Sequence, residues 1–316
     1  MGVDSALVDA RAEKLLYYSP YNFLRNVSAI TQQKLFGKGL AASFGENSQQ
    51  KIFTVNGVQF LYSFLPWDSD FFGASIYKLF TVIYTANSTA QEVAIAVKAF
   101  LLYTKEINCA YLFIDIPIED TLLIQALGIA GWRMVESRLN FYYDTISDFK
   151  YAQFPTRKAA PEEAELIGHI SATARNEYDR FHADEWFGNT RADAFLHRYA
   201  TAAVEGYCDT VLVPNEPDLV IDSFLAIDDA PIHAAKLGFR ASRIVLTAVG
   251  PANRGWHLKL AAATIHRARE MQANYVLMTT QATNRAVFRT CEKLGFKLGS
   301  TSCILSYANN LISSVQ

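Results

Sequence analysis

The stretch NRAVFRTCEKLGFK, residues 284–297, decides the fold of this chain. Asn284 has a short polar side chain that can cap a helix, and Gly295 supplies the left-handed residue at which a helix ends. The pattern therefore predicts a helix between these two residues and a last strand near residues 302–308. The run NYVLMTT, residues 274–280, predicts a strand immediately before the helix.

A second junction of strand and helix lies upstream, in RIVLTAVGPANRGWHLKLAAATIHRARE, residues 243–270. A buried strand ends at Val249, and a long helix is predicted over residues 256–272 with Asn253 as its cap. The unpaired N–H groups and the positive dipole end of such a helix form an anion site. Arg254 adds positive charge, so the junction suits a diphosphate, although many junctions of this kind bind nothing.

Together the two junctions resemble the GCN5-related N-acetyltransferase (GNAT) superfamily over about residues 155–308. The resemblance implies an α/β (α+β) GNAT fold, a central mixed sheet flanked by helices. It implies acetyl-CoA as the co-substrate, bound where two adjacent parallel strands part, with its diphosphate on the helix that follows the first strand. The residues that the resemblance assigns to acetyl-CoA are Ala248, Val249, Gly250, Arg254, Gly255, Trp256, His257, Leu258, Lys259 and Asn284.

The match departs from the family at the helix start. The family pattern is Arg-x-x-Gly-x-Gly/Ala, and here His257 and Lys259 stand at the glycine positions. Backbone donors survive this change because they do not depend on side chains. The two residues either supply positive charge to the CoA phosphates or are solvated residues of the first helical turn.

A cysteine, Cys291, stands where the family has a tyrosine that protonates the departing CoA thiolate. A thiol is a weak hydrogen-bond donor on a short side chain, so direct proton delivery would need a bridging water. The alternatives are a stand-in acid such as Tyr307, a covalent acetyl-Cys291 intermediate, or a small buried hydrophobic residue. The CoA thiol, with a pKa of about 8.5 by analogy with cysteine, leaves readily, so loss of the tyrosine slows the reaction rather than abolishing it.

The expected reaction is direct attack by a primary amine on acetyl-CoA in a ternary complex. The backbone N–H of Val249 is the expected donor to the oxyanion. The general base stays open among Asp222, Asp184 and His182.

A narrower resemblance is carried by LPWDSDFFGASIYKL, residues 65–79, and by RFHADEWFGNTRADAFLHRYATAAVEG, residues 180–206. Both look like the branch of the superfamily that acetylates the 4-amino group of dTDP-4-amino-4,6-dideoxyhexoses, which implies a sugar nucleotide as substrate and a role in polysaccharide biosynthesis. A sugar nucleotide needs a positive group for its diphosphate and an aromatic face for its base. The predicted substrate-binding residues are Arg180, His182, Asp184 and Asp222. The alternative for residues 180–184 is a solvated loop with a local Arg–Asp pair.

Two domains are expected: a partial GNAT-like domain with an N-terminal extension over residues 1–150, and a complete GNAT domain over residues 151–316. The runs over residues 126–143 and 291–307 both read as a helix end, a Gly-aromatic pair and a strand. This predicts an internal repeat, against the alternative of a common helix-to-strand turn.

The other expected elements are assigned from hydrophobic periodicity and turn residues. They are a loop over residues 37–50, a hairpin turn at Asn56-Gly57, helices at 91–106, 119–131, 161–176 and 188–204, strands at 110–117, 208–214 and 218–227, and a strand pair over 132–144.

Composition excludes several classes of function. The chain has 316 residues, enough for two domains, and a net charge of -2, so no basic field points to nucleic acid or to an anionic membrane. Apolar runs are too short for a membrane span, and the first residues lack a signal pattern, so we expect a cytoplasmic protein. The four cysteines are far apart, so we expect buried thiols and no metal site.

Two other functions stay open: a GNAT that uses another amine or a longer acyl chain, and a non-catalytic acyl-CoA-binding protein. The sequence leaves the oligomeric state open, a homodimer included.

Overall fold

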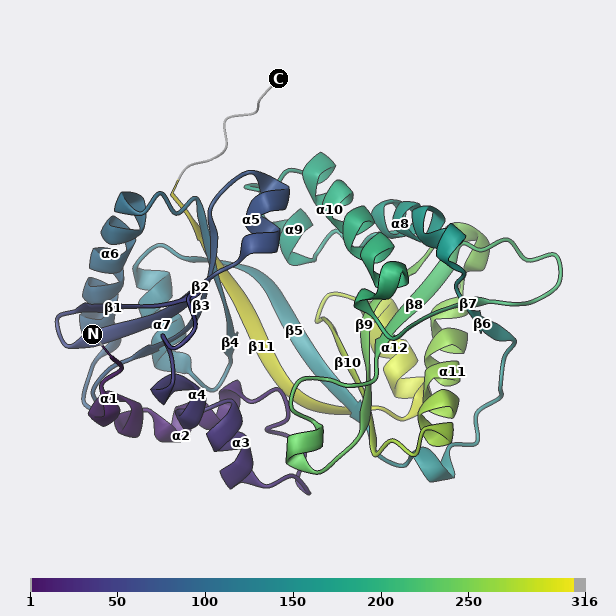
Figure 1. Ribbon diagram of the computed structural model, residues 1–316, viewed down its shortest axis with the longest axis horizontal. Helices are drawn as coiled ribbons and strands as arrows, with labels where there is room; N and C mark the ends of the chain where they lie inside the picture. The colour runs from purple at the N-terminus through teal and green to yellow at the C-terminus, as the bar shows by residue number, and fades with distance from the viewer. Residues whose placement is uncertain (1, 310–316) are drawn as a thin grey trace. The chain divides into compact units, whose positions relative to one another are not determined.

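The computed structural model describes residues 2–309, which form two compact units (Figure 1). Among the described residues, unit 1 comprises residues 2–137 and 300–309, and unit 2 comprises Arg138–Gly299. The chain therefore crosses from unit 1 to unit 2 within strand β5 and returns within strand β11. The assignment of one family domain to residues 1–150 and another to residues 151–316 stays a prediction.

Unit 1 is a five-stranded mixed sheet with helices on both faces. Its strands follow the order β1-β2-β3-β4-β11, in which only β3 and β4 pair in parallel. The helices and strands of unit 1 are α1 (Ser5–Ala10), α2 (Ala12–Leu15), η1 (Leu16–Tyr18), α3 (Ala29–Leu35), α4 (Lys38–Ala42), β1 (Gln50–Val55), β2 (Val58–Phe64), α5 (Pro66–Phe72), β3 (Ile76–Ile83), α6 (Ala90–Glu106), β4 (Tyr111–Pro117), α7 (Thr121–Ile129) and most of β11 (Lys297–Ala308).

Alternation along the strands of unit 1 sends side chains to two separate cores. On β2, Phe60 and Tyr62 pack with α6 and α7, whereas Leu61 between them packs with α1, α2 and α4. Residues of β3 divide in the same way. The N-terminal helices therefore cover the sheet face opposite to α6 and α7, and the run expected as loop over residues 37–50 contains helix α4.

Unit 2 repeats this plan with one more strand. Its order is β5-β10-β9-β8-β7-β6, in which only β9 and β10 are parallel. The helices and strands of unit 2 are β5 (Arg133–Tyr143, of which Arg138 onward belongs here), η2 (Ile146–Asp148), β6 (Thr156–Lys158), η3 (Pro161–Glu163), α8 (Ala164–Thr173), α9 (Arg180–Ala183), α10 (Asn189–Ala202), the π-helical turn η4 (Ala203–Tyr207), β7 (Thr210–Pro214), β8 (Ser223–Asp228), η5 (Ala235–Leu237), β9 (Ala241–Val249), η6 (Pro251–Asn253), α11 (Trp256–Glu270), β10 (Tyr275–Gln281) and α12 (Arg285–Leu294).

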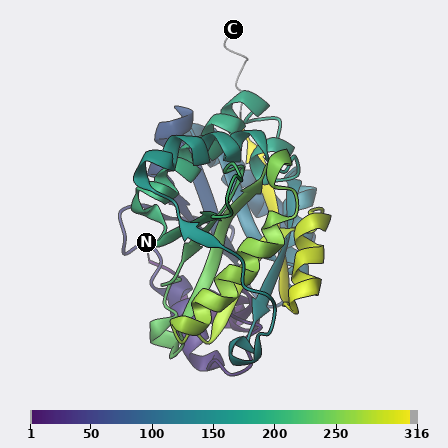
Figure 2. The ribbon, with the colours of Figure 1, turned by 90° about the vertical axis from the view of Figure 1, so that its right-hand side faces the viewer.

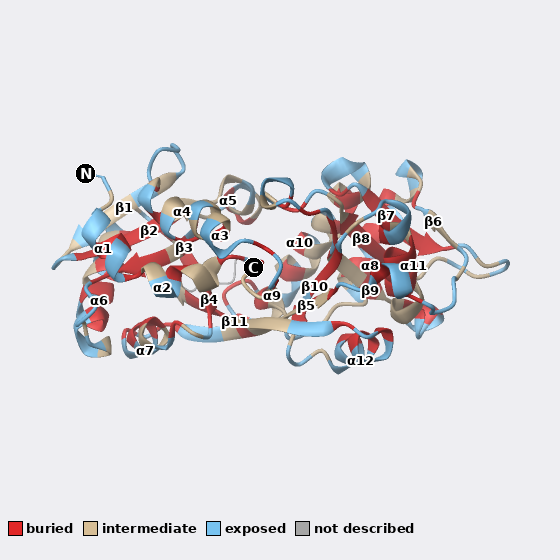
Figure 3. Ribbon diagram, turned by 90° about the horizontal axis from the view of Figure 1, so that it is seen from below, coloured by how far each residue is buried: buried red, intermediate tan, exposed pale blue. Residues whose placement is uncertain are grey.

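The sheet of unit 2 is also covered on both faces. Leu225 of β8 packs with α11 and α12, and its neighbour Phe224 packs with α8 and α10. Figure 2 looks onto unit 2, with α11 in yellow-green and α12 in yellow. Strands β2 and β3 of unit 1 and strands β7 and β8 of unit 2 are largely buried, as expected for sheets with two covered faces (Figure 3).

Most of the predicted elements lie within a few residues of their expected places, whereas helices α1 to α5 and α9 were not predicted. The Asn56-Gly57 turn joins β1 to β2 with positive φ at both residues, as its composition requires. One prediction is wrong: residues 132–144 form the single strand β5 rather than a strand pair. The predicted strand at 218–227 begins only at Ser223, because the residues before it enter the turn beside η6.

Gly295 ends α12 in a left-handed conformation, with φ of +83°. An alanine there is strained, so Gly295→Ala is expected to lower the free energy of unfolding by about 1 kcal/mol. Gly128 is the matched control, because it lies inside α7 with open space around it. Gly128→Ala is expected to raise the free energy of unfolding by about 0.5 kcal/mol. Urea denaturation measures both, and equal effects would contradict the assignment of the helix end.

Candidate functional site

The two parallel strands of unit 2 part after a short paired stretch. Pairing of β9 with β10 runs from Ala241 opposite Tyr275 to Ile244 opposite Met278, and both strands continue beyond it. The residue after the last pair, Val245, is an extra residue in the pairing of β9 with β8, that is, a β-bulge. A bulge bends its strand and increases the local twist, which accounts for the parting.

Beyond the bulge, β9 turns half of its backbone groups toward the gap. The N–H of Gly250 donates to the carbonyl oxygen of Asp222 at 2.7 Å, so this residue faces β8. In an antiparallel pair, successive residues face opposite sides. The N–H and C=O groups of Val249 and Thr247 therefore point away from β8, toward the space that β10 has left.

A buried asparagine fixes the turn after β9. Asn253 accepts from the Asp222 N–H at 2.9 Å and from the Ser223 hydroxyl at 2.8 Å, and it donates to the Val220 carbonyl at 3.0 Å. The Asp222 carboxylate accepts from the N–H of Ala252 at 2.8 Å. The prediction that Asn253 caps the following helix is wrong, because its side chain is used up inside this turn.

Helix α11 begins with unpaired backbone donors. Its N-cap is Gly255, with φ of +90°, and no side chain caps it. The first N–H groups of a helix then face outward with the positive end of the dipole. Arg254 stands exposed at this point and has no ion-pair partner among residues 2–309. This end of α11 therefore has the components of an anion site.

Neither side chain at the family's glycine positions offers free positive charge. His257 lies partly buried with its Nδ1 3.0 Å from the Thr290 hydroxyl, and burial lowers its pKa to about 4, so it is neutral at pH 7. Lys259 pairs with Glu216 at 2.9 Å and lies 4.2 Å from the centre of the Trp256 ring. This geometry does not favour a charged His257 at the phosphates, and the charge of Lys259 is already engaged, so the roles of both residues at the CoA phosphates stay a prediction.

Helix α12 has the predicted ends. Asn284 is its N-cap and accepts from the Val287 N–H at 3.2 Å. Cys291 is fully buried in the apolar core that α11 and α12 share, and burial raises the pKa of its thiol to about 12. A thiol in this position is a poor nucleophile and a poor acid, and this geometry favours its alternative role as a small buried hydrophobic residue.

Solved structures share this arrangement, although no family model and no curated protein matches the sequence. A GCN5-related N-acetyltransferase from Sphaerobacter thermophilus is 10% identical, with a TM-score of 0.54 over 96% of this chain and 93% of that one. One from Kribbella flavida is 13% identical, with a TM-score of 0.50 over 99% and 98%. A tandem GNAT protein from the clavulanic acid biosynthesis pathway, solved without AcCoA, is 11% identical, with a TM-score of 0.50 over 98% and 97%.

The chain has the GNAT fold. Identities this low establish the fold alone. Within that fold, the predicted acetyl-CoA residues fall into three groups, at the end of β9, at the start of α11 and at the N-cap of α12. Ala248 differs from its neighbours in that its backbone faces β8 and its side chain is buried against α8 and α10.

The predicted substrate-binding residues in and just after α9 are engaged in contacts within unit 2. His182 is contacted at both ring nitrogens, by Asp179 at 2.6 Å and by Asp193 at 3.0 Å. Burial lowers the pKa of His182, but the hydrogen bonds and charges of the two carboxylates outweigh it and raise the pKa overall. Arg180 is buried with its guanidinium 4.3 Å from the centre of the Phe181 ring, and Asp184 is buried as well. Their role as substrate contacts stays a prediction that this geometry does not favour.

Two residues of the candidate site were missed from the sequence. Thr247 shares the exposed backbone side of β9 with Val249, and the two-residue period of a strand could have identified it. Thr290 fixes His257, and no local pattern connects these two helices. Tyr307 lies on β11 in unit 1, opposite Leu112 and with its ring 6.3 Å from Trp132, and its role as a stand-in acid stays a prediction.

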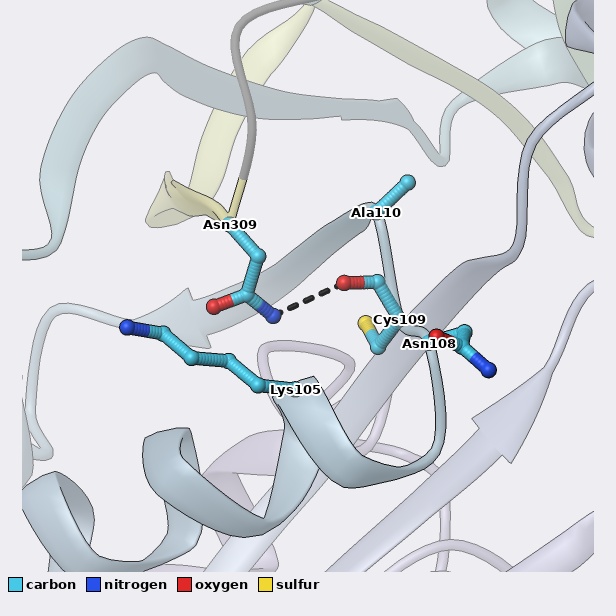
Figure 4. Close-up of a pocket in the computed structure, with 5 residues that line it drawn as sticks. All are labelled: Lys105, Asn108, Cys109, Ala110 and Asn309. Carbon is cyan, nitrogen blue, oxygen red and sulfur yellow. Dashed lines mark hydrogen bonds between the residues drawn. The ribbon is translucent and has the colours of Figure 1, made fainter.

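The pocket in unit 1 and the cysteines do not form a second candidate active site in the described residues. A pocket of about 240 Å³ in unit 1 is lined by Lys105, Asn108, Cys109, Ala110 and Asn309 (Figure 4). The Asn309 amide donates to the carbonyl of Cys109 at 2.7 Å, so these groups mainly secure the end of β11. All four cysteines are buried and unpaired. Within residues 2–309, no helix is long and apolar enough to cross a membrane, and no metal-binding group of three or more His, Cys, Asp or Glu residues occurs.

Gly250 is expected to tolerate no side chain. A Cβ atom there would overlap the Asp222 carboxylate, which the Ala252 N–H holds in place. Gly250→Ala is expected to lower the free energy of unfolding by about 2 kcal/mol. In an Asp222→Ala background the same change is expected to cost less than about 1 kcal/mol, because the overlapping group is gone. Equal costs in the two backgrounds, measured by urea denaturation, would show that the contact is absent.

His257 is expected to make stability fall with acid. Its pKa is about 4 in the folded chain and about 6.5 when unfolded, so below pH 6.5 the unfolded state binds the proton first. The free energy of unfolding therefore decreases as the pH falls from 6.5 to 4. Between pH 7 and pH 5 the wild type is expected to lose about 2 kcal/mol more than His257→Asn, which keeps a donor to Thr290 but does not titrate. Equal losses would mean that His257 protonates freely in the fold.

Proposed function

We propose that the chain is a GNAT-type N-acetyltransferase that transfers the acetyl group of acetyl-CoA to a primary amine. The observation that carries this proposal is the parting of β9 and β10 beside the uncapped start of α11. The gap offers the backbone groups of Thr247 and Val249 to the amides of a pantetheine arm. The helix start and Arg254 offer positive charge to a diphosphate.

The proposed chemistry needs little from Cys291. The amine attacks the thioester carbon while the N–H of Val249 stabilises the oxyanion, and CoA leaves as a thiolate that takes a proton from solvent. CoA is a good leaving group, with a thiol pKa of about 8.5 by analogy with cysteine. A buried thiol in place of the family's tyrosine is therefore compatible with turnover.

Among the three candidate bases, the geometry favours Asp222. His182 is engaged at both ring nitrogens and Asp184 is buried. Asp222 precedes Ser223, which lies opposite Val249, and one of its carboxylate oxygens is oriented by the Ala252 N–H. A carboxylate fixed at the end of β9 can accept the amine proton directly or through a water.

The finer proposal for the acceptor is the 4-amino group of a dTDP-4-amino-4,6-dideoxyhexose. It rests on the resemblance of residues 65–79 and 180–206 to that branch of the superfamily. The contacts of Arg180 and His182 within the protein weaken it, so another amine or a longer acyl group is the alternative within the same reaction.

A second function, binding of an acyl-CoA without catalysis, is favoured by one observation. Cys291 is fully buried at the position of the family's acid, so that position carries no acid. A binder would share the acetyl-CoA site with the enzyme and would release no CoA thiol.

Arg254 is expected to contribute strongly to acetyl-CoA binding. A charge-assisted contact to a diphosphate is worth about 1.5–3 kcal/mol, so Arg254→Ala is expected to raise the dissociation constant by about 10–100-fold. Isothermal titration calorimetry measures it, with Lys236→Ala of η5 as the control for loss of an exposed cation. If Arg254→Ala and the control bound acetyl-CoA with equal affinity, the diphosphate would not bind at this helix end.

Substitutions of Asp222 and Cys291 are expected to affect the turnover number kcat differently. CoA thiol release from acetyl-CoA is measured over a panel of amines that includes dTDP-4-amino sugars. With the amine that reacts, Asp222→Asn keeps an acceptor for the Ala252 N–H but loses the base, so kcat is expected to fall by about 10²–10⁴-fold. Cys291→Ala is expected to leave kcat within about threefold, as suits a residue outside the chemistry. A large loss in Cys291→Ala would restore its catalytic role, and acetyl-CoA binding without thiol release from any amine would favour the binder.

A further inference from the structure

Unit 1 contains a second copy of the parted strands. Strands β3 and β4 pair in parallel from Ile76 opposite Tyr111 to Leu79 opposite Ile114, over the same length as β9 and β10. The next residue, Phe80, is an extra residue in the pairing of β3 with β2, as Val245 is in β9. Each unit therefore has a bulge in the first of its two parallel strands, and the pairing of these strands ends just before the bulge.

Individual residues at the ends of the parted strands also correspond between the two units. Tyr84 lies as many residues beyond Leu79 as Val249 lies beyond Ile244. Asp120 precedes α7 as Asn284 precedes α12. The N-terminal helices of unit 1 cover one face of its sheet, and α8 and α10 cover the corresponding face of the sheet in unit 2. Residues 1–50 therefore have a structural counterpart in the second half of the chain.

A buried arginine bridges the gap of unit 1. Arg11 forms an ion pair with Asp120 on the β4 side, and its guanidinium lies 4.4 Å from the centre of the Tyr84 ring on the β3 side. Tyr18 donates to the same carboxylate at 2.6 Å. Arg11 and Asp120 are almost completely buried. The positions in unit 1 that correspond to the ends of the parted strands of unit 2 are thus joined by side chains.

The N-terminus of α6, the helix that follows β3, is capped by side chains as well. Thr89 caps α6, and Glu92 of the first turn accepts from the Thr89 N–H at 2.8 Å while its own N–H donates to the Thr89 hydroxyl at 3.3 Å. This capping box pairs two backbone donors at the start of α6, where α11 has no side-chain cap, and it sets a carboxylate where a diphosphate would bind. The corresponding turn in unit 2 has Gly255 and Arg254.

We propose that the cleft of unit 1 is a closed counterpart of the acyl-CoA cleft, sealed by the Arg11 bridge and the Glu92 cap, so that the chain binds one acyl-CoA, in unit 2. The stoichiometry rests on the proposed function, whereas the sealing of unit 1 does not. Within residues 2–309, the buried Arg11 Nε has no hydrogen-bond partner, whereas the Asp120 carboxylate interacts with Arg11, Tyr18 and Tyr84. The seal is held mainly by the charge pair, and loss of Arg11 would leave the buried Asp120 carboxylate without a counter-charge, although Tyr18 still donates to it.

Hydrogen exchange of the full chain tests the seal without any ligand. Arg11→Met is expected to accelerate amide exchange in residues 81–84 and 119–121 by about tenfold or more, with residues 241–249 unchanged. Lys38→Met is the matched control, because Lys38 forms an exposed ion pair with Asp9 on the same N-terminal segment. Arg11→Lys keeps the charge and guards against loss of folding, and it is expected to give an intermediate rate. Unchanged exchange at residues 81–84 in Arg11→Met, or the same increase in Lys38→Met, would overturn the seal.

Calorimetric titration with acetyl-CoA tests the stoichiometry. The wild type is expected to bind one molecule per chain, with an affinity that Arg254→Ala weakens. Two molecules per chain, or one molecule whose affinity Arg254→Ala does not change, would overturn the proposal. No binding at all would overturn the proposed function and the stoichiometry, while the exchange experiment would still decide whether unit 1 is sealed.

Discussion

The early end of the parallel pairing between β9 and β10 is the constraint on which the rest of the site depends. A single extra residue, Val245, bends β9 away, and the backbone of Thr247 and Val249 is left facing a gap rather than a strand. The Asp222 and Asn253 contacts then hold the turn that starts α11 next to that gap. In the proposed site, backbone groups and a helix end would make the contacts to acetyl-CoA, so the side chains at the family's glycine positions can differ.

The two units share one arrangement of strands and helices but differ in the polar side chains at the ends of their parallel strands. Both have a bulge, a short parallel stretch and a helix after each parted strand. Unit 2 leaves its helix start uncapped beside Arg254, whereas unit 1 closes its helix with Glu92 and its gap with Arg11. The difference lies in a few polar residues at the mouths of the gaps and not in the sheet.

The sequence predicted many of the helices and strands but few of the contacts of the site. Asn284, Gly295 and the Asn56-Gly57 turn could be predicted because capping and left-handed turns depend on local residues. The roles of Asn253 and His182 could not, because their partners are distant in sequence or lie across a helix pair. The helix at residues 38–42 was missed because its composition resembles a loop and its stability comes from packing under α1 and β3.

The backbone amides that respond to acetyl-CoA test the cofactor site most directly. In a titration followed by amide nuclear magnetic resonance of the labelled chain, we expect shifts at Thr247, Val249 and residues 256–258. We expect none at residues 81–84 of unit 1. Shifts at residues 81–84, or no shift at the end of β9 at saturating acetyl-CoA, would contradict the claim that the gap in unit 2 is the cofactor site.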